Sequence, residues 1–201
     1  MDLAILAATF GAIFVVELPD KTFIAALVLS TRYQPLAVWL GVGAAFGVQT
    51  MVAVTIGALA TLLPTVLIES VAAAIFLLGA VVLLRTASGA DAAQREQEEE
   101  YASKAAEPRS FLKASLASFL VLFVAEWGDL SQLLTISFVT SYHDHVSVFL
   151  GAWAALLTVS GLAIVAGRGL LRYLRLSVLH YIGAGVCLLL AVLTLVEIVA
   201  G

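Results

Sequence analysis

Six long apolar segments limit what this chain can fold into more than any other feature of its sequence. They span roughly residues 3–29, 36–62, 66–84, 112–139, 146–166 and 177–199. An α-helix rises about 1.5 Å per residue, so about 20 residues cross the roughly 30 Å hydrocarbon core of a bilayer. The segments therefore predict an all-α integral membrane protein with six transmembrane helices.

The composition agrees with a lipid environment. Hydrophobic residues make up 62% of the chain and charged residues 12%, and the mean hydropathy is +1.09. Soluble domains have about 25% charged residues. The sequence has no basic patch that would suit a nucleic acid. We therefore expect the chain to be surrounded by a lipid bilayer and to have no nucleic-acid partner.

The basic residues indicate the orientation of the chain. Residues 86–110, between the third and fourth segments, form a polar linker with an acidic run, which would be a solvated helix or a disordered tether. Apart from Lys21, all basic residues lie in or beside loops on the side of this linker: Arg32, Arg85, Arg95, Lys104, Arg109, Lys113, Arg168, Arg172 and Arg175. The positive-inside rule places the linker in the cytoplasm and both termini outside. We expect a multi-pass protein of a bacterial plasma membrane.

The two halves of the chain are similar in sequence. Leu40-Gly41 corresponds to Leu150-Gly151, and each half contains one copy of a shared heptapeptide. The copies are Glu17-Leu18-Pro19-Asp20-Lys21-Thr22-Phe23 and Glu126-Trp127-Gly128-Asp129-Leu130-Ser131-Gln132. Residues 1–85 are predicted to form one three-span repeat and residues 111–201 a second. Because three spans return the chain to the opposite side, the second repeat is inverted, as in transporters that expose one central site to each side in turn.

Each heptapeptide places two carboxylates inside an apolar segment: Glu17 with Asp20, and Glu126 with Asp129. A carboxylate in hydrocarbon costs several kcal/mol unless it is paired, protonated or metal-bound. The spacing predicts that the two carboxylates of a pair share one face of a helix. Both pairs fall near the middle of their spans, so the two halves would gather four carboxylates in one central cation site.

Neutral oxygen donors accompany the carboxylates, with Thr22, Ser131 and Gln132 as secondary candidates for ligands. Pro19 and Gly128 weaken their helices and would free backbone carbonyls. Oxygen ligands suit Mn²⁺, Ca²⁺ or Mg²⁺. Crowded carboxylates also favour protonation of one another, which gives proton-for-metal exchange a physical basis. We expect no resident cofactor, because the metal would be the transported substrate.

The duplicated motif resembles the E-x-G-D-(K/R)-(S/T) signature of the Golgi-type manganese/calcium transporter family, cation antiporters within the lysine-exporter superfamily. The resemblance implies a small six-span fold and ion binding by Glu17, Asp20, Glu126 and Asp129, with Thr22, Ser131 and Gln132 beside them. Two positions depart from the signature. Pro19 stands where the family has Gly, and Leu130 where it has Lys or Arg, so Lys21 is the one basic residue within the two motifs.

Together these features predict a secondary active transporter, not an enzyme. It would export a divalent cation from the cytoplasm, Mn²⁺ ahead of Ca²⁺, in exchange for H⁺ or Na⁺. A homo-oligomeric assembly is compatible with this architecture. The alternatives are an exporter of small organic cations or amino acids, and a structural membrane subunit that transports nothing. An intramembrane hydrolase is disfavoured, because the sequence has no nucleophile constellation or His motif for a metal.

Two further sets of polar residues have both a functional and a structural interpretation. His143, Asp144 and His145 would form either a metal-collecting trio or an ordinary turn in an outward loop. The second set lies in the second and fifth apolar segments and would either line the transport path or pack helices: Gln49, Thr50, Thr55, Thr158 and Ser160.

Overall fold

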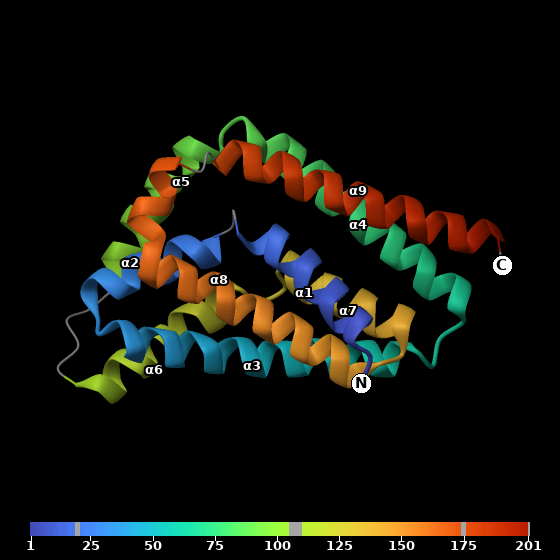
Figure 1. The fold of residues 1–201 in the computed structure, drawn as a ribbon, viewed down its shortest axis with the longest axis horizontal. Helices are drawn as coiled ribbons and strands as arrows, with labels where there is room; N and C mark the ends of the chain where they lie inside the picture. The colour runs from blue at the N-terminus through green and yellow to red at the C-terminus, as the bar shows by residue number, and fades with distance from the viewer. Residues whose placement is uncertain (19–20, 105–109, 174–175, 201) are drawn as a thin grey trace.

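The computed structural model describes residues 1–18, 21–104, 110–173 and 176–200, and over these ranges the chain is helical, without strands (Figure 1). The helices are α1 (Leu3–Glu17), α2 (Lys21–Arg32), α3 (Pro35–Ala60), α4 (Thr65–Ala87), α5 (Ala90–Lys104), α6 (Phe111–Ala125), α7 (Leu130–Tyr142), α8 (His145–Tyr173) and α9 (Leu176–Ala200). The fold class predicted from the apolar segments is therefore correct in being all-α.

Within the described residues, length and composition support between three and five membrane spans. Helices α3, α4 and α8 are each long and apolar enough to cross a bilayer. The pairs α1–α2 and α6–α7 pass the same test only when each pair counts as one broken span. In α9 the described apolar stretch is His180–Val196, so this criterion does not test the sixth predicted span over its full length. The chain is a multi-pass membrane protein.

The first and fourth predicted spans are broken rather than continuous. Helix α1 meets α2 at 70°, and α6 meets α7 at 73°. In the second break Glu126 is the C-cap of α6 and Asp129 the N-cap of α7. Between them Gly128 has φ +77°, in the left-handed region that glycine adopts without a steric penalty. The expectation that Glu126 and Asp129 share one helix face is therefore wrong, because they lie on opposite sides of a turn.

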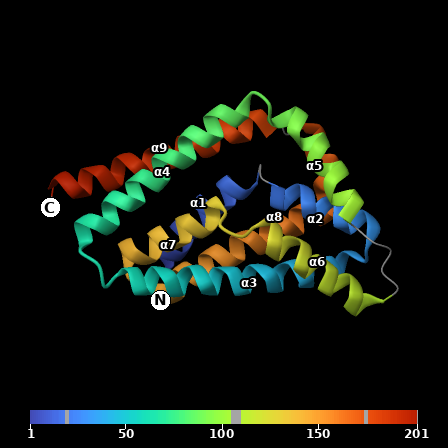
Figure 2. The same ribbon diagram turned by 180° about the vertical axis from the view of Figure 1, so that it is seen from behind.

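The two broken helices pack against the two long helices α3 and α8 in a reciprocal way. Helix α1 lies against α8, α6 lies against α3, and α3 also packs on α8 (Figures 1 and 2). At Gly151 an added Cβ would lie 2.6 Å from the carbonyl oxygen of Leu6, and at Gly41 it would overlap that of Ser115. These glycines let the backbones approach closely, as small residues do between membrane helices.

Two tryptophans join α3 to α8 by hydrogen bonds across the helix interface. Trp39 Nε1 donates to the carbonyl oxygen of Leu157 at 3.1 Å, and Trp153 Nε1 donates to that of Gly43 at 2.9 Å. A buried indole N–H needs such a partner. The long helices therefore form a fixed support for the broken ones.

The acidic linker contains helix α5, which packs against α2 and α9. Tyr101 and Ala90 of α5 are buried, and they belong to the same hydrophobic cluster as Tyr33, which follows α2. The part of the linker that the structure describes is therefore a helix held on the bundle. Both chain termini lie toward the end of the molecule away from α5 (Figures 1 and 2).

Candidate metal centre

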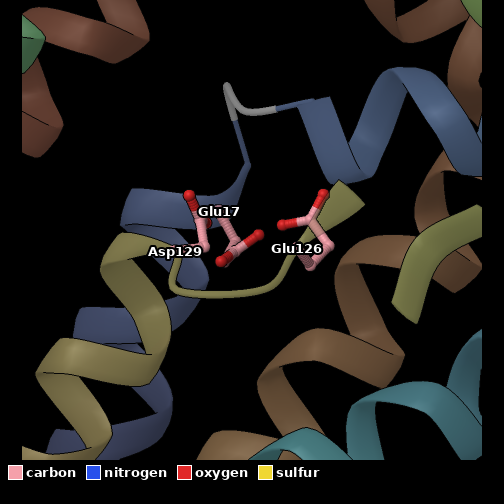
Figure 3. A group of neighbouring side chains, drawn as sticks. All are labelled: Glu17, Glu126 and Asp129. Atoms are coloured by element: carbon pink, nitrogen blue, oxygen red, sulfur yellow. The ribbon is translucent and has the colours of Figure 1, made fainter. Parts of the chain in front are cut away.

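Three of the four predicted carboxylates come together where the broken helices meet (Figure 3). Glu17 reaches the site from the end of α1, and Glu126 and Asp129 flank the turn between α6 and α7. One carboxylate oxygen from each lies within 4.8 Å of the others. The fourth predicted residue, Asp20, lies outside the described residues, and so does Pro19.

The carboxylates are withdrawn from solvent. Glu17 has 0% of its surface exposed and Glu126 has 3%, while Asp129 is half-buried. Negative charges repel strongly in a medium of low polarity, and each also loses the hydration that stabilises it. A proton or a cation shared among the three groups would relieve both costs. The geometry is therefore suited to binding positive charge.

The three secondary candidates differ in their surroundings. Thr22 is fully buried, and its hydroxyl has no hydrogen-bond partner among the described residues. Ser131 is buried near the start of α7. Gln132 spans the turn, because its Nε2 donates to the carbonyl oxygen of Glu126 at 2.9 Å and its Oε1 accepts from Gly128 N at 3.1 Å. Gln132 therefore fixes the backbone that carries Glu126.

A small internal cavity of about 10 Å³ adjoins Glu126. Its polar lining comes from two helices, with Gln49 and Thr50 on α3 and Ser131 and Thr135 on α7. This volume is about that of one water-sized sphere. The cavity extends the carboxylate cluster with neutral groups on one side.

The other predicted path residues do not line this cavity. Thr55 and Thr158 are exposed and donate to carbonyl oxygens of their own helices, at 2.8 and 2.7 Å. Ser160 is buried, but its hydroxyl donates to the carbonyl oxygen of Leu157 at 3.1 Å. A larger groove of about 610 Å³ between α3 and α8 is apolar, and no carboxylate lines it. The buried carboxylates and the polar cavity therefore lie together at the helix breaks.

In the loop formed by His143, Asp144 and His145, the carboxylate of Asp144 is engaged in hydrogen bonds that hold the local structure. Asp144 accepts hydrogen bonds from the backbone N–H of Ser147 at 3.0 Å and from its hydroxyl at 2.6 Å. It also accepts from Asp2 N at 3.0 Å, which fixes the start of the chain to the start of α8. These contacts favour the interpretation as a turn.

The pKa of Asp144 predicts a pH effect on stability. Hydrogen bonds from the Ser147 side chain and backbone lower this pKa from 3.8 to about 2 in the folded chain. The stabilisation is therefore fully present above about pH 4 and is lost as the pH falls through 2. We expect Asp144→Asn to lower the thermal unfolding temperature at pH 7, by a margin that narrows below pH 4. A margin that does not change between pH 7 and pH 2.5 would contradict this assignment.

The sequence did not predict that two glutamine side chains hold the backbone of the site by hydrogen bonds. Gln132 holds the turn, and Gln49 Nε2 donates to the carbonyl oxygen of Phe123 at 3.0 Å, one turn before Glu126. The available signal was the presence of glutamines in otherwise apolar helices. Their partners are backbone atoms, however, and the breaks that expose those atoms are set by tertiary structure.

Broken apolar helices surround a buried, oxygen-rich acidic cluster, an arrangement typical of membrane proteins that carry ions through their interior. The sequence profile described as "Divalent cation/proton antiporter GDT1" matches residues 5–91 and 114–201. The chain belongs to this family. The resemblance inferred from the duplicated motif is thereby confirmed.

Several curated proteins are similar to the chain. The chloroplastic GDT1-like protein 2 of Oryza sativa subsp. japonica is 36% identical over 210 residues, which cover 93% of this chain and 59% of the relative. The chloroplastic protein PAM71 of Arabidopsis thaliana is 30% identical over 211 residues, or 96% of this chain and 57% of the relative. The GDT1-like protein sll0615 of Synechocystis sp. is 36% identical over 169 residues, covering 78% and 82%.

This chain spans about three fifths of the length of the chloroplast relatives. No solved structure matches it.

Proposed function

We propose that this chain is a secondary active transporter that exports a divalent cation from the cytoplasm, Mn²⁺ first and Ca²⁺ next, in exchange for protons. The observation that carries the proposal is the buried cluster of Glu17, Glu126 and Asp129 at the two helix breaks. Membership of a family described as divalent cation/proton antiporters supports the same ion class and the proton as counter-ion. Na⁺ is the alternative counter-ion.

The cluster itself suggests how the exchange is coupled. Three negative charges within 4.8 Å would repel one another, so the site favours a bound positive charge, which either a proton or a metal ion can supply. A divalent cation would neutralise the same charge and displace protons bound there. Metal and protons would therefore compete for one site. A gradient of one across the membrane would then drive transport of the other in the opposite direction.

For the architecture we propose six spans in two inverted repeats, with α1–α2 and α6–α7 as equivalent broken spans and α9 as the sixth span. The reciprocal packing of α1 on α8 and of α6 on α3 supports this arrangement. So does the division of the family match into two parts, one on each side of residues 92–113. The side that carries α5 would be cytoplasmic, and both termini would lie outside.

The size of the cavity beside Glu126 favours an inorganic ion over an amino acid or an organic cation. A volume of about 10 Å³ accommodates one water-sized particle. The acidic cluster likewise offers more negative charge than a monovalent organic cation needs. The metal interpretation therefore accounts for both features.

The test is transport by the purified full chain in proteoliposomes that carry an imposed pH gradient. Mn²⁺, Ca²⁺ and Mg²⁺ are compared, and a Na⁺ gradient replaces the pH gradient in parallel vesicles. The proposal requires metal movement that reverses when the pH gradient is reversed. If no divalent cation moves under either gradient, the proposal is wrong.

A further inference from the structure

We propose that Gln49 and Thr50 of α3 supply uncharged oxygen ligands on one side of the cation site. These ligands would make the site select Mn²⁺ and Ca²⁺ over Mg²⁺. This inference rests on the proposed function and specifies its substrate preference. It starts from the cavity beside Glu126, which Gln49 and Thr50 line together with Ser131 and Thr135 of α7.

Both α3 residues are polar and almost completely buried, with 3% of their surface exposed. Thr50 borders the cavity, and its hydroxyl has no hydrogen-bond partner among the described residues. A bound ion, or a water on that ion, would supply the partner that Thr50 lacks.

Gln49 is oriented by a contact outside the cavity. Its Nε2 donates to the carbonyl oxygen of Phe123 at 3.0 Å. With the amide nitrogen committed, the amide oxygen is the group left to accept, and it offers a neutral ligand beside the Glu126 carboxylate. This orientation also links α3 to the segment of α6 that precedes the break.

The two residues of α3 that border the cavity differ in type from the corresponding residues of α8. Because Gly41 corresponds to Gly151, Gln49 and Thr50 correspond to Val159 and Ser160. Val159 has no ligand atom in its side chain, and the Ser160 hydroxyl donates to its own helix. Of these four positions, Gln49 and Thr50 line the cavity beside Glu126, whereas Val159 and Ser160 do not. The ion would therefore lie closer to Glu126 than to the centre of the cluster.

Neutral oxygens in a small cavity discriminate between ions by the cost of dehydration. Mg²⁺ sheds its water reluctantly and demands near-ideal octahedral geometry, whereas Ca²⁺ accepts carbonyl and hydroxyl oxygens in flexible arrangements. An amide and a hydroxyl replace water for an ion that dehydrates readily. Removing them leaves carboxylates that attract any divalent cation.

The experiment compares Thr50→Val with Thr55→Val in the full chain. Valine keeps the shape of threonine but lacks the hydroxyl. Thr55 lies on the same helix, is exposed, and donates to the carbonyl oxygen of Met51 at 2.8 Å, so its replacement is the matched control. The readouts are the binding of Mn²⁺ by calorimetry in detergent, the competition by Mg²⁺, and transport in proteoliposomes.

We expect Thr50→Val to weaken Mn²⁺ binding about tenfold, as for loss of one hydrogen bond or ligand contact to a charged group. Mg²⁺ affinity should hardly change, so the ratio of Mn²⁺ affinity to Mg²⁺ affinity falls by the same factor. Thr55→Val should keep the ratio of the original chain. Thr50→Ser, which keeps a hydroxyl, should also keep that ratio. If Thr50→Val does not fold, Thr50→Ala serves in its place.

An unchanged ratio in a folded hydroxyl-free variant would overturn this inference and leave the proposed function intact. Failure of the unsubstituted chain to move any divalent cation would instead overturn the proposed function.

Discussion

Glu126→Gln is expected to reduce divalent-cation transport by more than about a hundredfold without unfolding the protein. The substitution keeps the size of a side chain that is 3% exposed and removes its charge. In binding, loss of one partner of a buried charge pair costs about 2–5 kcal/mol or more, and the middle of that range corresponds to more than two powers of ten in affinity. Glu17→Gln should act similarly, because Glu17 is completely buried in the same cluster.

Thermal unfolding separates a binding defect from a folding defect. Saturating Mn²⁺ should raise the unfolding temperature of the original chain, because a ligand that binds only the folded state stabilises it. In Glu126→Gln that increase should disappear, while the metal-free unfolding temperature holds or rises as repulsion within the cluster is relieved. Glu99→Gln, on the exposed surface of α5, is the control and should retain both transport and the metal-induced shift. Full transport by Glu126→Gln would refute the assignment of the site.

The membrane character of the chain and the identity of the acidic cluster could be predicted because they depend on local pattern. Apolar length indicates spanning helices whatever their neighbours are, and a carboxylate in such a segment requires a reason. Duplication of the motif then indicated that Glu17 and Glu126 would meet. The structure brings them together with Asp129, within 4.8 Å.

The geometry of the site could not be predicted to the same extent. Spacing of three residues suggests a shared helix face only if the helix continues, and the positive φ of Gly128 ends it between Glu126 and Asp129. A glycine in a membrane helix is often a packing residue, as Gly41 and Gly151 are here. The sequence alone does not distinguish these two uses, because the difference arises from the neighbouring helices.

The neutral polar residues that line the cavity beside Glu126 could not be predicted from the sequence pattern either. From the sequence, five polar residues of the two long helices were equally good candidates to line a transport path. Their burial and hydrogen bonds in the structure distinguish those that border the cavity from those that do not. Gln49 and Thr50 border the cavity, whereas Thr55 and Thr158 face outward and bond to their own helices. Which face of an apolar helix points inward depends on how the helices pack, and a segment that is apolar all round carries little information about it.

Gly128→Val is expected to weaken metal binding about tenfold or more through the backbone alone. At φ +77° a β-branched side chain is strained by about 1–2 kcal/mol. A Cβ built on Gly128 has no atom within 4 Å beyond its chain neighbours, so the first atom of the new side chain meets open space. The strain should favour a straighter connection between α6 and α7. Such a connection would move Asp129 away from Glu126 and disturb the two hydrogen bonds that Gln132 makes across the turn.

Gly128→Asn provides the comparison, because asparagine adopts the left-handed region far more readily than valine. If the turn itself positions the carboxylates, Gly128→Asn should retain most of the Mn²⁺ affinity and transport, and Gly128→Val should lose both. Equal losses in the two variants would mean that any side chain at this position interferes, for example by blocking the route of the ion. Equal retention would mean that Glu126 and Asp129 converge without the left-handed glycine, and that the break does not position the site.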